Sequence, residues 1–317
     1  MPSSSADSGA ATGGGFIKFV AGGAVLSAGA TVLILRSAGY FAKVCFSRSR
    51  NLGVVISGST RGFGYAMANS FLEYGDRVVV SGRKTDDVKR VVAELRSKFA
   101  SDPPRVFGCS CDVRDPDSVE FLAQESSRHL GHIDVWVNNA GVSQSPKAAI
   151  FETPVEDIRS IVETNLLGTF YGSRAAMSVM KTNSKEGKRG MNGHIFNVDG
   201  SGSRGNRTPG SAAYGASKAA IPQLTSSLSA EGQKSDVKVG VHVISPGMVT
   251  TDLLLGNKFN EKKKKGNKAQ DLQALKIFNI LAEKPETAAD WVVPRMRGVV
   301  AASTDKMSSN IILPLLV

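Results

Sequence analysis

From Gly53 onward, short apolar runs alternate with longer amphipathic stretches. The short runs, rich in β-branched residues, predict strands at Gly53–Ser57, Arg77–Ser81, Arg105–Ser110, Ile133–Asn138, His194–Val198 and Lys238–Ile244. The longer stretches predict helices over Asp86–Phe99, Asp117–Leu130, Val155–Met180 and Ala212–Glu231. Strands that alternate with helices are typical of right-handed βαβ units. The pattern therefore predicts an α/β protein built on a doubly wound parallel sheet.

The two ends of the chain depart from this pattern. Residues 1–15 are rich in Ser, Gly and Ala, and we expect them to be disordered. Residues 16–35 are mostly apolar and about long enough to span a bilayer, so we interpret them as a membrane anchor, a cleaved targeting segment or an ordinary helix. We expect a linker over 36–52, a single catalytic domain over 53–300, and an extension or last strand over 301–317.

Composition excludes several classes of protein. The 41% hydrophobic residues and 33 glycines are ordinary for a chain that forms a core, which excludes disordered, collagen-like and disulfide-stapled proteins. The net charge of +11 lies mainly in two patches: residues 1–50 carry a net +4, and residues 258–268, with six lysines against Glu261, carry a net +5. The chain has no basic stripe interleaved with aromatic residues, so we expect no nucleic-acid partner. The run Lys262–Lys265 is either an exposed loop or lid, or simply a solvated charge run.

The cysteines and histidines predict neither disulfides nor a metal site. Cys45, Cys109 and Cys111 cannot all pair, and a Cys-x-Cys spacing suits a disulfide poorly, which favours a reducing compartment. The four histidines are scattered and lack the spacing of metal ligands. We therefore expect no metal.

The first predicted strand runs into a glycine-rich turn that reads Ser-Gly-Ser-Thr-Arg-Gly-Phe-Gly. Gly58 permits a tight turn, Gly62 lets the backbone approach a pyrophosphate, and Gly64 allows close packing of helix and strand. The phosphate charge then meets the N–H groups at the start of the helix. The turn predicts a dinucleotide site of the Rossmann type. Its predicted contacts are Gly58, Ser59, Thr60, Arg61, Gly62, Phe63 and Gly64.

Two arginines bear on the choice of cofactor. A dinucleotide fold that selects NAD usually carries an acidic residue after its second strand. Here that strand is followed by Arg83, and Arg61 lies inside the glycine turn. A guanidinium group pairs bidentately with phosphate oxygens, so these cations favour a 2′-phosphate, unless both are ordinary surface charges. The predicted cofactor is NADPH.

Tyr214 and Lys218 form a Tyr-x-x-x-Lys motif within a predicted helix. Side chains four residues apart lie on one face of a helix, which places the ammonium group beside the phenol. Free tyrosine titrates near 10, and lowering that pKa by about three units requires roughly 4 kcal/mol of preferential phenolate stabilisation. Lys218 and a nicotinamide ring could share that contribution, which makes Tyr214 a candidate general acid. Because so short a motif also occurs by chance, its weight depends on the motifs around it.

Further motifs follow in a fixed order. Asn138-Asn139-Ala140-Gly141 closes the fourth predicted strand, Asn165 lies on the next helix, and Ser245-Pro246-Gly247 closes the sixth strand. Together with the glycine turn and Tyr-x-x-x-Lys, this order resembles the short-chain dehydrogenase/reductase family from Gly53 to about Gly298. The resemblance implies a Rossmann fold, a nicotinamide cofactor and oxidoreductase activity.

The resemblance also implies roles for individual residues. Tyr214 would donate the proton, Lys218 would bind the ribose and tune the tyrosine, and Asn165 would hold a water that links Lys218 to solvent. Asp112 and Val113 would line the adenine pocket. Asn139 would support the central sheet and the nucleotide, while Pro246, Gly247 and Thr250 would border the nicotinamide. The cofactor contacts implied in this way are Asp112, Val113, Asn139, Ala140, Gly141, Tyr214, Lys218, Pro246, Gly247 and Thr250.

One segment departs from the pattern of that family. The family usually has Asn-x-Ser-Ser after the fifth strand, and the second serine binds the substrate carbonyl thirteen residues before the tyrosine. Here Asn197 is followed by Val-Asp-Gly-Ser-Gly-Ser, so counting back from Tyr214 reaches Ser201, whereas counting forward from Asn197 reaches Gly200. Ser201 and Ser203 are the two candidates for the carbonyl contact, with Ser201 preferred. Asp199 is either a turn residue or a group that orients the substrate.

Four longer segments resemble a narrower group, the chlorophyll(ide) b reductases of plants and green algae. They are His194–Gly200, Ser245–Leu254, Phe278–Pro285 and Asp290–Pro294. This resemblance implies NADPH-dependent reduction of the 7-formyl group of chlorophyll b or chlorophyllide b to a 7-hydroxymethyl group. It also implies a chloroplast setting, in the stroma or at the stromal face of the thylakoid membrane. The family commonly pairs through helices, which implies a homo-oligomer or a hetero-oligomer with a related reductase.

Two other functions are compatible with the same cofactor residues. One is a short-chain reductase that acts on a 3-oxoacyl, retinoid or steroid carbonyl, although such enzymes usually carry paired serines where this chain has Asp199 to Ser203. The other is a non-catalytic subunit that binds NADPH, against which the intact Tyr214, Lys218 and Asn165 argue. The apolar stretches Leu253–Leu255 and Leu272–Leu281 are interpreted as either lid elements over a large flat substrate or ordinary core helices.

Overall fold

The structure is a computed structural model that describes residues 50–182, 192–234, 238–251, 253, 282–302 and 310–312. The predicted anchor or targeting stretch 16–35, the run Lys262–Lys265 and the segment Leu272–Leu281 lie outside the described residues. Within the described ranges, no helix combines the length and the apolar character needed to cross a membrane.

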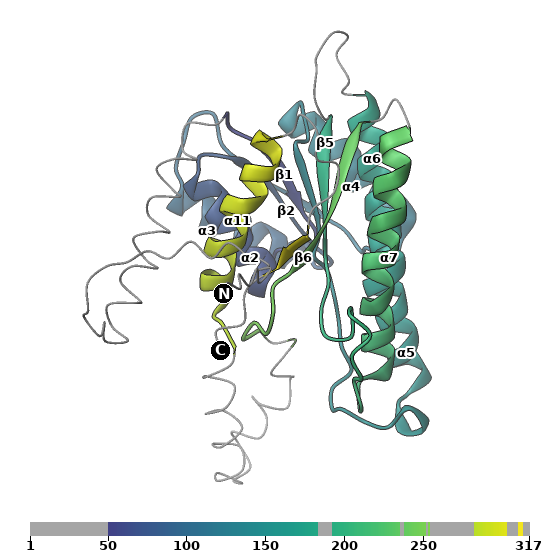
Figure 1. Cartoon of the computed structure of the whole chain (residues 1–317). Helices are drawn as coiled ribbons and strands as arrows, with labels where there is room; N and C mark the ends of the chain where they lie inside the picture. Colours follow the sequence, from purple (N-terminus) through teal and green to yellow (C-terminus); the bar gives the residue numbers. More distant parts are fainter. Residues whose placement is uncertain are drawn as a thin grey trace, which may run out of the picture. The chain divides into compact units, whose positions relative to one another are not determined.

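A parallel seven-stranded sheet forms the centre of the fold (Figure 1). Its strands are β1 (Gly53–Ile56), β2 (Arg77–Gly82), β3 (Val106–Ser110), β4 (Val135–Asn138), β5 (Gly193–Val198), β6 (Val239–Ser245) and β7 (Asn310–Ile312). They follow the order β3-β2-β1-β4-β5-β6-β7, and the central pairs bring Val55 opposite both Val79 and Trp136. The six predicted strands are confirmed to within two residues at each end. The order reverses direction between β1 and β4, where open α/β sheets bind their ligands.

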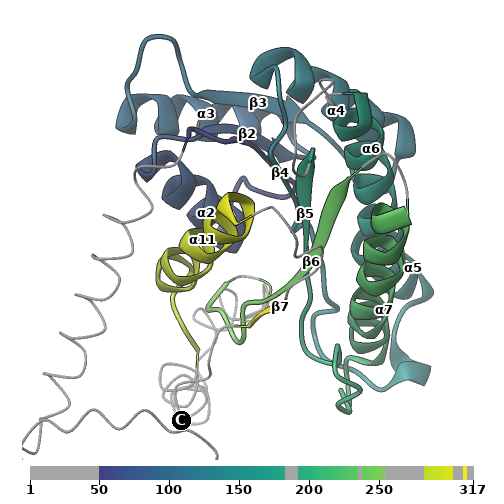
Figure 2. The same ribbon diagram turned by 45° about the horizontal axis from the view of Figure 1, so that its top comes forward.

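Helices cover both faces of this sheet (Figures 1 and 2). On one side lie α2 (Gly62–Glu73), α3 (Thr85–Lys98) and α11 (Pro285–Ala301). On the other side lie α4 (Pro116–Leu130), η1 (Ile150–Glu152), α5 (Val155–Val162), η2 (Glu163–Leu167), α6 (Gly168–Thr182) and α7 (Ala212–Lys234). The doubly wound α/β fold predicted from the alternation is therefore present.

Burial explains why the central strands read as continuous apolar runs. All four residues of β1 and all six of β5 are buried, as expected for parallel strands covered on both faces. Alternate side chains enter two separate cores. Ile56 packs with Phe71 of α2 and Met296 of α11, whereas Trp136 packs on the opposite face. The two layers fix the carboxyl ends of the strands, from which the candidate site is built.

The predicted single helix over Val155–Met180 is interrupted. A π-helical turn, η2, separates α5 from α6 and contains Asn165. The Asn165 carbonyl accepts a hydrogen bond from the Thr169 hydroxyl at 2.8 Å, while its side-chain amide bonds the backbone of Val142 in both directions. Bonds from the side chain to a neighbouring loop anchor this turn. Single π turns of this kind are frequent at functional sites.

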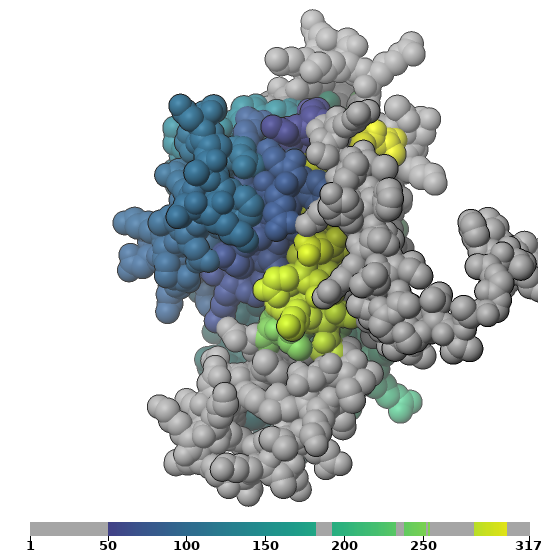
Figure 3. Space-filling view, turned by 90° about the vertical axis from the view of Figure 1, so that its left-hand side faces the viewer, coloured from purple at the N-terminus to yellow at the C-terminus, as the bar shows by residue number. Residues whose placement is uncertain are grey.

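A buried ion pair attaches α11 to the rest of the domain. Arg297 of α11 pairs with Asp76, which follows α2, and both side chains are fully buried. Asp76 also accepts the backbone N–H of Leu52 at 2.9 Å, so the pair joins α11 to the residue just before β1. In the space-filling view, the yellow surface of α11 lies directly against α2 (Figure 3).

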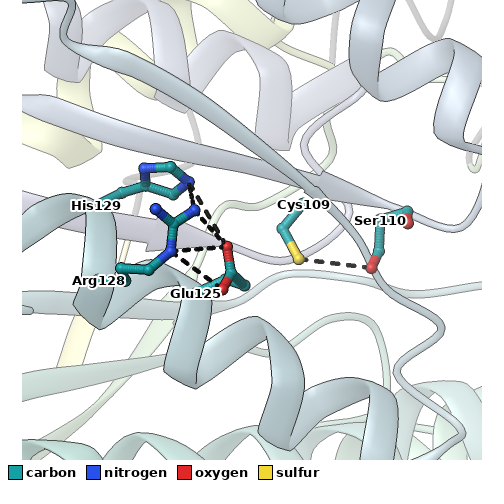
Figure 4. A network of polar contacts seen from close by, with 5 residues as sticks. All are labelled: Cys109, Ser110, Glu125, Arg128 and His129. Atoms are coloured by element: carbon teal, nitrogen blue, oxygen red, sulfur yellow. Dashed lines mark hydrogen bonds and ion pairs between the residues drawn. The ribbon is translucent and has the colours of Figure 1, made fainter.

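A second polar network closes the carboxyl end of α4 (Figure 4). The guanidinium group of Arg128 donates to Glu125 one turn earlier at 2.7 Å, and the ring of His129 stacks on Phe107 of β3 with centroids 4.7 Å apart. Basic side chains suit the negative end of a helix dipole. The buried Cys109 lies on the same strand, with its sulfur 3.6 Å from the Ser110 carbonyl. This network stabilises the helix end and contributes no side chain to the candidate site.

Candidate functional site

The turn between β1 and α2 needs glycine at two positions with positive φ. Gly58 has φ +62° and Gly62 has φ +58°, values that side-chain-bearing residues rarely adopt. A Cβ atom at Gly58 would also lie 2.8 Å from the Cα of Ala140. A Cβ atom at Gly64 would lie only 2.5 Å from the Gly58 carbonyl oxygen. Only glycine therefore fits where α2 approaches the turn so closely. The turn is thus held against the end of β4.

Hydrogen bonds fix the turn to the neighbouring strands. The Asn139 amide donates to the carbonyls of Ser57 and Gly58, both at 3.0 Å. The Ser57 hydroxyl in return accepts the backbone N–H groups of Asn139 and Ala140 at 3.0 and 3.1 Å. Asn139 therefore holds the turn in place, as its predicted supporting role requires.

Ser59, a predicted cofactor contact, uses its side chain within the fold. Its side chain is fully buried, donates to the Ile56 carbonyl at 2.7 Å and accepts the N–H of Ser81 at 2.9 Å. The hydroxyl thus connects the turn to β2 and faces away from the cavities described next. A contact between a nucleotide and Ser59 could involve only its backbone.

Two adjoining cavities, each of about 330 Å³, open beside the turn. Both are lined by Gly58, Arg61, Arg83, Gly141 and Val142. Helix α2 begins here at Gly62, and its first turn carries no acidic side chain, so its N–H groups and the positive end of its dipole suit an anion. The cavities at the glycine turn therefore adjoin backbone donors and cationic side chains that suit an anionic ligand.

One cavity carries most of the cationic lining. Thr60, Lys84 and Arg90 join Arg61 and Arg83 around it, with Asp87 as the one acid among its lining residues. Sequence reasoning missed Lys84, Arg90 and Asp87, although Lys84 directly follows the predicted Arg83. A wall of four cations against one carboxylate is suited to a multiply charged ligand.

Asp112 and Val113, predicted for the adenine pocket, face different surroundings. Val113 is buried and lines the cationic cavity, next to Cys111 and Thr164. The Asp112 carboxylate forms a bidentate ion pair with Arg114, with contacts of 2.6 to 3.1 Å. That pairing lowers the pKa of Asp112 below its usual value.

Tyr214 and Lys218 lie on the first turns of α7 and face the end of β5. Lys218 is buried and donates from Nζ to the Val198 carbonyl at 2.9 Å. Burial lowers the pKa of Lys218 to about 8, because the ammonium ion loses hydration. Burial, which disfavours the charged phenolate, and the negative charge of Asp199 together raise the pKa of Tyr214 to about 12.

The Tyr214–Lys218 pair adjoins the two cavities through Gly141. A Cβ at Gly141, which lines both, would lie 3.8 Å from Lys218 Nζ and 3.4 Å from the side-chain oxygen of Asn165. Asn165 is fully buried and donates to the Ser217 hydroxyl on α7 at 3.0 Å. The structure thus brings Asn165, Tyr214 and Lys218 together, next to the wall of the cavities.

The segment after β5 contains one more residue than the usual family pattern, and the structure shows how the chain accommodates it. Gly200, not a serine, lies against the Tyr214 hydroxyl: a Cβ there would approach the oxygen more closely than the 3.0 Å that real Cβ atoms keep. Ser201 is exposed, whereas Ser203 is half-buried, donates its N–H to the Gly200 carbonyl at 3.0 Å and hydrogen-bonds Asp199. Ser201 and Ser203 both stay predicted contacts of the substrate oxygen.

The segment after β6 forms another part of the cavity wall. Thr251 and Leu253 line one cavity, and Thr251 approaches the glycine turn closely enough that a Cβ at Gly62 would lie 3.3 Å from its methyl group. Thr250, which was predicted to border the nicotinamide, donates both its N–H and its hydroxyl to the backbone carbonyl of Glu283. Pro246 is buried and Gly247 takes φ +70°. Thr251 and Leu253 thus line the cavity, while Pro246, Gly247 and Thr250 stay predicted neighbours of the nicotinamide.

Compared with known protein families, residues 53–262 match the family described as short chain dehydrogenase. The chain belongs to the short-chain dehydrogenase family. Members of this family use NAD(P)(H), and their oxidoreductase chemistry is consistent with the Tyr-x-x-x-Lys pair described above.

Several curated relatives are similar to the chain over most of its length. Chlorophyll(ide) b reductase NOL of Arabidopsis thaliana is 41% identical over 254 residues, which cover 80% of this chain and 67% of the relative. The NOL protein of Oryza sativa is 40% identical over 78% of this chain and 66% of its own length. Rice NYC1, named a probable chlorophyll(ide) b reductase, is 40% identical over 80% of this chain, which spans about half of that relative. All three are named as chloroplastic.

Solved structures share the fold. A short-chain type dehydrogenase/reductase from Mycobacterium marinum has a TM-score of 0.66 at 25% identity, over 86% of this chain and 97% of that one. An archaeal alcohol dehydrogenase from Thermococcus sibiricus, solved with 5-hydroxy-NADP, has a TM-score of 0.62 at 21% identity, over 83% of this chain and 96% of its own. The second similarity concerns the fold alone.

Proposed function

We propose that this protein reduces the 7-formyl group of chlorophyll b or chlorophyllide b to a 7-hydroxymethyl group, using NADPH. The observation that carries the proposal is the 41% identity to a chlorophyll(ide) b reductase over 80% of the chain. The intact Tyr214 and Lys218 beside the cavities support catalysis rather than binding alone. Loss of the formyl group from the pigment, coupled to cofactor oxidation, would be the reaction measured.

The residues around the glycine turn fit a phosphorylated dinucleotide. The N–H groups at the start of α2 would hold the pyrophosphate, with the backbone of Gly62 close to it. Arg61 and Arg83 would pair with a 2′-phosphate, which favours NADPH over NADH. When bound, this cofactor supplies the hydride that reduces the formyl carbon.

The chain's own residues would manage the proton. Tyr214 would donate its hydroxyl proton to the substrate oxygen as negative charge grows there. Lys218, held by the Val198 carbonyl, would keep its positive charge beside the phenol and so stabilise the phenolate that remains. Ser201 or Ser203 would donate a hydrogen bond to the same substrate oxygen. Asn165, bonded to Ser217, would fix α7 in register with the cavity wall.

Apolar side chains near the site suit a large, flat pigment. Leu253 is 43% exposed and lines one cavity, and Phe151 of η1 is 86% exposed. The loop before η1 is held to the loop after β5, because the Ala148 N–H and the Gln144 amide both donate to the Gly210 carbonyl. A tetrapyrrole ring would bury apolar surface against these two side chains.

The setting follows from the same relatives. We infer that the protein works in the chloroplast, in the stroma or at the stromal face of the thylakoid membrane, because the curated relatives are named as chloroplastic. We further infer that it assembles as a homo-oligomer or with a related reductase, as the family resemblance implies.

A pigment assay tests the function. The full chain is mixed with NADPH and either chlorophyllide b or chlorophyll b, and the pigments are separated by chromatography. We expect the 7-hydroxymethyl product with the wild type, less with NADH, and none with Tyr214→Phe. If a folded wild-type protein binds NADPH and leaves both pigments unchanged, the pigment is not its substrate. Turnover of a 3-oxoacyl, retinoid or steroid carbonyl in its place would identify a different reductase.

A further inference from the structure

Three consecutive residues at the end of β5 surround the Tyr214–Lys218 pair. The Val198 carbonyl accepts the Lys218 ammonium group at 2.9 Å, and the backbone of Gly200 presses on the Tyr214 hydroxyl. Between them lies Asp199, whose side chain is only 7% exposed. A carboxyl group is costly to bury unless its partners satisfy it, so its presence at this point calls for a reason.

The partners of the Asp199 carboxyl hold it in one orientation. The Ser245 hydroxyl, at the end of β6, donates to it at 2.5 Å, and Ser203 hydrogen-bonds it from the loop. Its backbone N–H donates to the Ile244 carbonyl at 2.9 Å, which continues the pairing of β5 with β6. Burial raises the pKa of Asp199 above its usual value, whereas the hydrogen bonds from these neutral donors oppose that rise and favour the ionised carboxylate.

The charged groups that face Asp199 come from two elements. Lys218 and Tyr214 of α7 and Arg204 of the loop after β5 interact electrostatically with Asp199. From β6, the Asp199 carboxyl group accepts a hydrogen bond from the neutral Ser245 hydroxyl, and the Asp199 N–H donates to the Ile244 carbonyl. The Arg204 side chain is exposed, so solvent screens its charge more strongly than that of the buried Lys218. The electrostatic effect of Asp199 therefore falls mainly on the catalytic pair.

We propose that Asp199 is a positioning residue that acts on the proton donor: its carboxylate, oriented by Ser245, places a fixed negative charge beside the Tyr214–Lys218 pair. The charge favours the ammonium form of Lys218 and the phenol form of Tyr214, so the pair enters the reaction with both protons in place, and the ammonium ion is then available to stabilise the phenolate that forms. This inference rests on the proposed reductase function, in which Tyr214 is a general acid.

The electrostatics of the pair have the sign that this role requires. A negative charge disfavours a nearby phenolate and favours a nearby ammonium ion. Asp199 accordingly adds to the burial that raises the pKa of Tyr214 to about 12, and opposes the burial that lowers the pKa of Lys218 to about 8. Removing the charge should lower both pKa values, which moves the loss of activity at alkaline pH to lower pH.

The test replaces the charge and keeps the shape. In the full-length protein, Asp199→Asn is compared with the charge-conserving Asp199→Glu and with Glu120→Gln, which removes a carboxylate from the surface ion pair with Arg174. Ionisation of Tyr214 is followed by ultraviolet difference titration, with Tyr214→Phe subtracted to remove the signal of the other tyrosines. Near-ultraviolet circular dichroism confirms that each variant is folded. This titration needs no pigment, so its outcome does not depend on the substrate assignment.

We expect Asp199→Asn to shift the Tyr214 titration to lower pH by about one unit, the lower end of the range for a close charge. The alkaline limb of the activity profile should move in the same direction. Asp199→Glu should restore most of the wild-type profile, and Glu120→Gln should leave both curves unchanged. An unchanged titration in folded Asp199→Asn would overturn the proposal, as would an equal shift in Glu120→Gln. A shift without pigment turnover would support the proposal on Asp199 and refute the assigned substrate.

Discussion

The close contact between Gly200 and Tyr214 makes a specific prediction. The family usually has a serine at the position that Gly200 occupies when the chain is counted forward from Asn197. In this protein, a Cβ there would collide with the Tyr214 oxygen. Gly200→Ser, although it restores the usual residue, should therefore lower activity rather than raise it.

The size of the effect follows from the geometry. To regain an ordinary contact of 3.4 Å, the Tyr214 oxygen or the Gly200 backbone must move by about 1 Å. Movement of the backbone is opposed by the strand pairing of Asp199 with Ile244 and by the Ser203 N–H that binds the Gly200 carbonyl at 3.0 Å. A misplacement of about 1 Å at a reacting group costs about 100-fold in rate. We expect kcat to fall by about that factor in both Gly200→Ala and Gly200→Ser.

The assay compares these variants with a matched change in the same loop. Gly205 also has positive φ, +79°, but a Cβ there has no atom within 4 Å, so Gly205→Ala adds strain without a collision at Tyr214. Steady-state reduction of the pigment and fluorescence titration with NADPH are measured for each. We expect NADPH affinity within about twofold of the wild type throughout, and loss of kcat in the Gly200 variants alone. Wild-type kcat in Gly200→Ser, or an equal loss of kcat in Gly205→Ala, would show that a collision with Tyr214 is not the cause.

Three further outcomes concern stability and the cofactor. Arg297→Met leaves Asp76 charged and buried, so urea denaturation should show a loss of about 3–5 kcal/mol in the free energy of unfolding, whereas a loss below about 1 kcal/mol would contradict a structural pair. Arg83→Ser should weaken NADPH at least about tenfold and NADH little, by calorimetry; equal losses would place Arg83 away from the 2′-phosphate. Burial lowers the pKa of His194 to about 4 and that of His242 to about 3, so the unfolded chain, with pKa near 6.5, binds protons first as pH falls. Stability should therefore decline below about pH 6.5, by up to about 1.4 kcal/mol per pH unit for each histidine, and a flat profile between pH 7 and 5 would contradict this.

Hydrophobic patterning predicted the sheet because parallel strands buried on both faces leave a strong signal. β1 and β5 are entirely buried and read as continuous apolar runs. The π turn at Asn165 left no such signal, since it depends on hydrogen bonds to Val142, a residue more than 20 positions earlier in the chain. β7 was left open as an extension or a last strand, because three residues are too few for a period to be recognised.

The candidate site, too, could be predicted only where its features are local in the sequence. Glycines with positive φ and the four-residue spacing of Tyr214 and Lys218 are local properties, so the sequence located them. Side-chain direction is not local. Sequence alone could not decide that Ser59 faces β2, and the cavity contact of Thr251 depends on how the segment after β6 returns to the glycine turn.

The contacts of Asp199 and Gly200 are likewise visible only in three dimensions. Gly200 lies against Tyr214 and Lys218, whereas the neighbouring Asp199 is bonded to Ser245 of β6. No spacing in the sequence encodes that arrangement. The sequence did mark the place, because its Asp-Gly-Ser-Gly-Ser run departs from the family pattern. Departures from a local rule concentrate at functional sites.

Tyr214 and the cofactor held at the glycine turn are proposed to act together on the pigment's formyl group. This is tested with NADPH that carries deuterium at both C4 positions and with chlorophyllide b, followed by mass spectrometry of the product. We expect the wild type to give a 7-hydroxymethyl pigment with one deuterium on its hydroxymethyl carbon, and Tyr214→Phe to give no such product. A product without deuterium, or the same yield from Tyr214→Phe, would contradict this proposal.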